Sequence, residues 1–159
     1  MMKKIVLYSA VFMLFGSFAQ TAEYKAVDGD SLMLEERRLR LDGIDAPEFT
    51  QSCFDAAGAE YLCGLKSLKY LESLMTDSVV KCDCLPEPDI YNREVCECFA
   101  DEVSLNRAMV YAGYAMTYRS EKYADAEQNA KSAKRGIWQG KFMRPALFRA
   151  LERVRHSEK

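Results

Sequence analysis

Six cysteines constrain this chain more than any other feature of its sequence. Four of them form two Cys-x-Cys motifs, at residues 82–84 and 96–98, and the numbers of the outer pair and of the inner pair add to the same total. Residues that face each other on two antiparallel strands have this property, and residues two apart share one face of a strand. The spacing therefore predicts a hairpin in which Cys82 pairs with Cys98 and Cys84 with Cys96, which leaves Cys53 to pair with Cys63.

The first residues have the layout of a secretory signal peptide. Lys3 and Lys4 precede an apolar run at residues 5–15, which is too short to cross a bilayer comfortably, and residues 17–19 are Ser-Phe-Ala. We expect cleavage after Ala19 and an exported protein, periplasmic or secreted, with no membrane span in the mature chain. An oxidising compartment favours disulfides over the alternative of a metal site, for which the Cys-x-Cys spacing is unusual. Six cysteines allow fifteen pairings, so the connectivity is an inference from spacing.

The pattern of apolar residues predicts one domain of the α+β class. Short strands are expected at residues 24–27, 31–34, 39–42, 79–84 and 93–99, and helices at 55–75, 104–112, 123–137 and 145–153. Asp55 is a candidate N-cap for the first helix. Five short strands interrupted by a helix predict a small barrel over residues 20–140, followed by a basic helical tail at 141–159.

The only histidine, His156, lies three residues from the end of the sequence. Ser-His-Asp triads, Cys-His dyads and His-rich zinc centres need a histidine in a packed cleft, so these classes of enzyme are excluded. An enzyme with this sequence works with carboxylates, arginines, hydroxyls or thiols.

Two segments carry residues suited to phosphodiester chemistry. Asp30, Asp45 and Glu48 offer hard oxygen ligands of the kind that calcium and magnesium prefer. Arg40 and Arg93 offer planar cations that match the geometry of a phosphate. Each residue taken alone has a plain structural explanation, since Asp-Gly-Asp is a common turn and a strand arginine is usually solvated. The combination is what indicates metal-assisted hydrolysis, with arginines that stabilise phosphate charge and a carboxylate that handles the water.

The order of these segments resembles the staphylococcal nuclease (thermonuclease) family, in its exported bacterial branch. The resemblance covers residues 24–138 and depends on the motifs VDGDS, LRLDGIDAPE, Cys63-Gly64, DIYNR, SLNRAMVYAGYA and AKRGIW. It implies a five-stranded OB-fold β-barrel with three helices, to which residues 145–153 would add a fourth. It also implies a calcium-dependent endonuclease acting on DNA and RNA.

The resemblance also implies roles for single residues. Asp30 and Asp45 match the calcium carboxylates, and Ala46 matches a residue that gives its carbonyl to the ion, although the best-known member has threonine there. Glu48 matches the glutamate that handles the attacking water, and Arg40 and Arg93 match the phosphate-binding arginines. The expected substrate contacts are Tyr91, near the nucleotide phosphate, and Tyr118, for which an ordinary packing role is the alternative.

The charge distribution is unusual for a protein that binds nucleic acid. The formal net charge is −2, but residues 131–159 hold nine Lys and Arg against two Glu. One interpretation of the tail is a helix that packs on the barrel through Leu147, Leu151 and Val154 and leaves a solvated charged face. The other is that its cations attract phosphate, as the acidic body cannot.

We expect a monomer that acts on DNA and RNA with no stable protein partner. Two rivals stay open: an OB-fold module that binds nucleic acid without cutting it, and an exported protein that binds another partner through its basic tail.

Overall fold

The computed structural model of the chain describes residues 23–157, and the predicted signal peptide lies outside them. The elements, in chain order, are β1 (Tyr24–Asp28), β2 (Ser31–Leu34), β3 (Arg37–Leu41), β4 (Ile44–Asp45), β5 (Ser52–Phe54), β6 (Glu60–Leu62), α1 (Cys63–Met75), β7 (Val80–Cys84), β8 (Glu94–Ala100), β9 (Val103–Ser104), α2 (Leu105–Tyr111), β10 (Met116–Thr117), α3 (Ala124–Ser132), the 3-10 helix η1 (Gly136–Gln139) and α4 (Pro145–Ser157). No helix in this part of the chain has the length and apolar character needed to cross a bilayer.

The main sheet contains the five strands that the sequence predicts. Their order is β1-β2-β3-β8-β7, with the short β9 beside β8. The pairs β1–β2, β2–β3 and β7–β8 are antiparallel, and β3 and β8 are parallel. Within residues 23–157 no ladder joins β7 back to β1, so the sheet curves without closing there, as the partly open barrel of an OB-fold allows.

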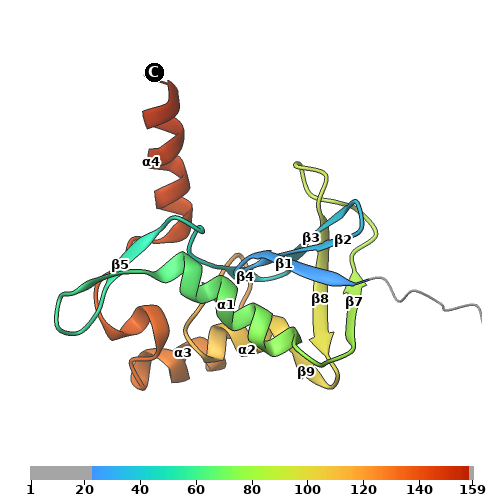
Figure 1. Ribbon diagram of the computed structural model, residues 1–159, viewed down its shortest axis with the longest axis horizontal. Coiled ribbons are helices and arrows are strands. Elements are labelled where there is room, and N and C mark those ends of the chain that lie inside the picture. Colours follow the sequence, from blue (N-terminus) through green and yellow to red (C-terminus); the bar gives the residue numbers. More distant parts are fainter. Residues whose placement is uncertain (1–22, 158–159) are drawn as a thin grey trace, which may run out of the picture.

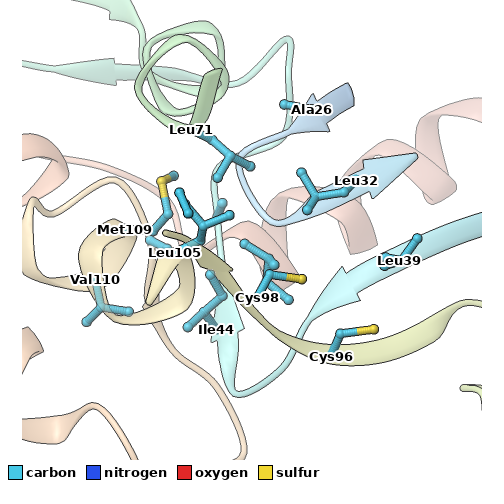
Figure 2. Packing of buried hydrophobic residues seen from close by; sticks show 14 of the residues in the cluster. Ala26, Leu32, Leu39, Ile44, Leu71, Cys96, Cys98, Leu105, Met109 and Val110 are labelled. Atoms are coloured by element: carbon cyan, nitrogen blue, oxygen red, sulfur yellow. The ribbon is translucent and has the colours of Figure 1, made fainter. Parts of the chain in front are cut away.

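The core lies between the sheet and the first two helices. Every second residue of β8 is buried from Cys96 onward, and β2 and β3 also turn alternate leucines inward. Figure 2 shows these side chains packed against α1 and α2. The fully buried members include Leu32, Leu39, Leu41, Leu71, Cys96, Cys98, Leu105, Met109 and Val110.

The six cysteines form the three pairs that the sequence symmetry predicts. On the β7–β8 ladder Cys82 lies opposite Cys98 and Cys84 opposite Cys96, with Cα–Cα distances of 4.1 and 4.0 Å. The third disulfide joins Cys53 on β5 to Cys63 at the start of α1, with a Cα–Cα distance of 5.6 Å. The hairpin register follows from strand alternation alone, which is why spacing was enough to predict it.

The first helix starts eight residues later than the sequence predicts. Asp55 is not an N-cap: its Oδ1 accepts the N–H groups of Ala57 and Ala59, each at 2.9 Å, and so closes the turn between β5 and β6. Residues 60–62 form β6, and α1 begins at Cys63. Local apolar spacing could not separate the end of a short strand from the start of a helix.

The last two helices also differ from their predicted extents. α3 ends at Ser132, and Ile137 belongs to the separate turn η1. Gly136 lies there at φ +55°, and a Cβ on it would come within 2.1 Å of the Gly113 carbonyl oxygen, which explains a glycine at this close approach.

α4 runs four residues past its predicted end and extends away from the rest of the molecule (Figure 1). Its apolar stripe does not pack on the barrel: Leu147, Leu151 and Val154 are all exposed. The packed-helix interpretation of the tail is therefore wrong for this stripe. Among the residues of α4 only Pro145 is buried.

Candidate active site

Arg40 brings the two predicted metal carboxylates together. It lies on β3, opposite Ser31 in the ladder, and so beside the turn that carries Asp30. Its Nη1 donates to Asp30 Oδ1 at 3.0 Å, and its Nη2 donates to the Ile44 carbonyl at 3.1 Å and to Asp45 Oδ1 at 3.4 Å. Both aspartates are almost fully buried, so the arginine supplies the pairing that buried charges need.

The electrostatics of this group follow from its burial. Removal from water raises the pKa of Asp30 to about 7, against the opposing attraction of Arg40. Burial also works to lower the pKa of Arg40, but Asp30 and Asp45 outweigh it and raise that pKa above its ordinary value. A metal ion bound to the Asp30 carboxylate would therefore compete with a proton.

The turn around Asp30 is fixed by close packing. The Ala46 amide donates to Asp30 Oδ2 at 3.1 Å, so Ala46 lies beside the carboxylate that it was predicted to assist. A Cβ on Gly29 would lie 1.9 Å from Ser67 Oγ and 2.7 Å from the Ala46 Cβ. The glycine of Asp-Gly-Asp thus lets the turn press against α1. A contact of the Ala46 carbonyl with an ion stays a prediction.

Glu48 lies on a loop that packs against the start of α1. Gln51, fully buried, donates its backbone N–H to the Glu48 carbonyl at 2.7 Å and accepts the Glu48 N–H at its Oε1 at 3.2 Å. A Cβ on Gly64 would come within 1.7 Å of the same carbonyl oxygen, so only glycine permits this approach. The Cys53–Cys63 disulfide links the strand after the loop to the start of α1.

Arg93 is held by Asp89, a residue for which the sequence predicts no role. Arg93 Nε and Nη2 donate to Asp89 Oδ2 at 2.8 and 2.6 Å, and Asp89 Oδ1 accepts the N–H groups of Tyr91 and Arg93. Burial works to raise the pKa of Asp89, but these hydrogen bonds prevail and lower it. The exposed Tyr91 ring lies 5.4 Å from the Arg93 guanidinium.

Most of the predicted site residues line one cleft of about 980 Å³. Tyr118 lies on it beside Arg40, whose guanidinium carbon is 5.9 Å from the tyrosine ring centre. Asp45 and Ala46 lie behind the wall, buried, and are not among the lining residues. The predicted residues that do line it are Asp30, Arg40, Glu48, Tyr91, Arg93 and Tyr118.

The sequence of this chain matches a known protein family. Residues 38–140 match the family described as staphylococcal nuclease homologue. The chain belongs to that family. A protein named succinoglycan biosynthesis protein ExoI, from Rhizobium meliloti (strain 1021), is 37% identical to this chain over 117 residues, which is 70% of this chain and 61% of that protein. This staphylococcal nuclease homologue therefore spans less than two thirds of the length of that relative.

A third arginine at the site was not predicted from the sequence. Arg149 on α4 donates from one nitrogen, Nη1, to Glu48 Oε1 at 2.7 Å, and the same nitrogen lies 2.9 Å from Asp45 Oδ1. Burial opposes its charge, but the two carboxylates raise its pKa above the ordinary value. Arg149 lies beyond the residues that match the staphylococcal nuclease homologue family and 101 residues from Glu48. The only sequence signal was its place in a basic, helical tail.

The predicted metal ligands fit calcium by chemistry but are separated by arginines. The carboxylates of Asp30, Asp45 and Glu48 are hard oxygen donors. Arg40 bridges the first two and Arg149 the last two. Within residues 23–157 one group of three possible donors, Cys84, Glu94 and Cys96, has its ligand atoms within 4.8 Å of one another, but its sulfurs form a disulfide and offer no thiolates.

Proposed function

We propose that this protein is an exported nuclease that hydrolyses phosphodiester bonds of DNA and RNA with the help of calcium. The observation that carries the proposal is one cleft lined by Arg40, Glu48 and Arg93, with buried Asp30 in its wall and buried Asp45 behind it. Export is supported by three disulfides, which persist in oxidising compartments. Membership of a nuclease-type family supports the class of substrate.

The two arginines bind and orient the phosphodiester. Arg93 is held in place by two hydrogen bonds to Asp89, so little conformational freedom is lost when it meets a phosphate oxygen. Arg40 has its Nη1 and Nη2 already engaged with Asp30, Ile44 and Asp45, which fixes the plane of its guanidinium at the cleft wall. Fixed cations of this kind stabilise the negative charge that grows on the phosphoryl oxygens.

Glu48 handles the attacking water. Its carboxylate lines the cleft and is partly open to solvent, so water can reach it. The buried backbone of its loop holds the side chain toward the cleft, where it orients a water and accepts its proton. Asp30, Asp45 and the Ala46 carbonyl would hold a calcium ion, which would supply further positive charge near the phosphoryl oxygens. Tyr91 lies beside Arg93, where it would be near the nucleotide phosphate, and Tyr118 lies beside Arg40 and offers an aromatic face on which a base can stack.

The test uses the oxidised protein with plasmid, single-stranded DNA and RNA, in calcium and in chelator. We expect calcium-dependent cleavage, which Glu48→Gln and Arg40→Ala each reduce by about 10²–10³. Arg107→Ala is the matched control, because this arginine is paired with Asp125 at the surface and does not line the cleft. A gel shift without cleavage would instead indicate a binding module. The absence of both cleavage and a gel shift would indicate a protein that does not act on nucleic acid.

A second candidate function is participation in succinoglycan biosynthesis. The observation that favours it is the name of the 37% identical relative. It is tested by deleting the gene in its host and measuring succinoglycan, then restoring either the natural gene or a Glu48→Gln variant. Restoration by both would show a role that does not need the proposed chemistry of the cleft.

A further inference from the structure

Arg149 is placed where a cation would have to bind. Asp45 Oδ1 lies 2.9 Å from Arg149 Nη1 and 3.4 Å from Arg40 Nη2, so two guanidinium groups share one buried oxygen. Calcium coordinates carboxylate oxygens at about 2.3–2.6 Å, so an ion on Asp45 Oδ1 would lie no farther than about 5.5 Å from Arg149 Nη1. Two positive charges separated by so short a distance repel each other strongly in a partly buried site.

Within residues 23–157, the ion pairs that join α4 to the carboxylates of the cleft all come from Arg149. The segment before α4 is fixed independently, since Phe54 and Lys141 exchange two backbone hydrogen bonds and Gln51 Nε2 donates to the Met143 carbonyl at 2.7 Å. Beyond Pro145 no residue of the described helix is buried. In Figure 1 α4 extends outward from this fixed start. Arg149 can therefore leave its carboxylates without unfolding the core.

We propose that Arg149, held by Glu48, is an internal counterion that competes with calcium for Asp45, so that α4 sets the calcium requirement of the site. It is a positioning residue, since it acts through the two carboxylates. The inference rests on the calcium site of the proposed function. Arg149 lies outside residues 38–140, which match the family, so the proposal assigns an effect on calcium affinity to a residue outside that match.

The helix also provides a matched control. Arg153 is one turn further along α4 and lines the same cleft, but among the described residues it takes part in no ion pair. Neutralising Arg149 and neutralising Arg153 remove the same charge from the same face of the helix. Only the first breaks an ion pair with the carboxylates.

The decisive measurement is calcium binding by calorimetry, without substrate, to the oxidised protein and its variants. We expect Arg149→Met to lower the calcium Kd by about tenfold or more, the size of an ordinary coupling between two sites. Arg149→Lys keeps a cation that can compete, so its Kd should stay near that of the natural protein. Arg153→Met should change the Kd by less than about threefold, and thermal unfolding in chelator checks that each variant folds.

Two kinds of failure are distinguishable. If the natural protein binds calcium and Arg149→Met binds it equally or more weakly, or if Arg153→Met matches the gain, the counterion proposal is overturned and the proposed function stands. If neither the natural protein nor Arg149→Met binds calcium, the calcium site fails and this inference fails with it. Calcium binding by Arg149→Met alone would support the competition directly. The calcium concentration for half-maximal cleavage should fall by the same factor as the Kd.

Discussion

Arg93 and Arg149 reach the same cleft in opposite ways. Arg93 is held by Asp89, four residues away, in the loop that joins β7 to β8, and these two strands carry two disulfides. Arg149 lies on a helix that is mostly exposed, and the carboxylates that hold it are about a hundred residues away in the sequence. The first arginine is fixed before any ligand arrives, because its partner is local and its support covalent. The second depends on charge, so ions and salt can change its position.

The largest expected effect is on catalysis and comes from replacing Arg93, the arginine that is fixed before a ligand binds. Arg93→Ala should lower kcat on single-stranded DNA at saturating calcium by about 10²–10³, because it removes a preorganised cation from the phosphate. The calcium Kd of this variant should not change, in contrast to Arg149→Met. Arg107→Ala serves as the surface control, and near-normal turnover in Arg93→Ala would contradict the proposed role.

The next effect concerns the stability of the hairpin. Replacing all four cysteines of β7 and β8 by serine should lower the free energy of unfolding by about 2–4 kcal/mol. Replacing only Cys84 and Cys96 should cost less, because the Cys82–Cys98 disulfide still closes the loop around them. Urea unfolding measures both. Equal losses in the two variants would contradict this expectation, because the Cys82–Cys98 disulfide would then add no stability once Cys84–Cys96 is gone.

Asp30 should make stability depend on pH. Its folded pKa is raised to about 7 from 3.8, so between these values the folded state holds a proton that the unfolded state has lost. In chelator the free energy of unfolding should therefore fall as pH rises from about 4 to 7, by up to about 1.4 kcal/mol per unit. Asp30→Asn should flatten this slope. A natural protein whose stability rises steadily across this window would contradict the expected protonation.

The smallest effect on stability should come from α4. Deleting residues 144–159 should change the free energy of unfolding by less than about 1 kcal/mol. The deletion removes little buried surface, the lost Arg149–Glu48 pair is partly exposed, and buried Asp45 keeps its contact with Arg40. Binding of DNA should weaken, and its salt slope should decrease by about 0.7–0.9 for each phosphate that the helix neutralises in the full chain. An unchanged salt slope in the folded truncation would show that the helix does not touch substrate.

The sequence by itself determined the parts of the molecule that depend on local periodicity. The β7–β8 register and its disulfides follow from the alternation of side chains along paired strands. The sequence also predicted Asp30, Arg40 and Asp45 as members of one candidate site, and in the structure Arg40 contacts both aspartates.

Only the tertiary structure decided which distant groups meet. The late start of α1 depends on the turn that Asp55 closes and on the β5–β6 hairpin, which apolar spacing does not reveal. In sequence, Arg149 is one cation among several in a basic tail, and nothing local separates a solvated arginine from one that binds a carboxylate. Its role appears only when the chain folds and brings α4 beside Glu48, because an ion pair depends on distance in space and not on separation along the chain.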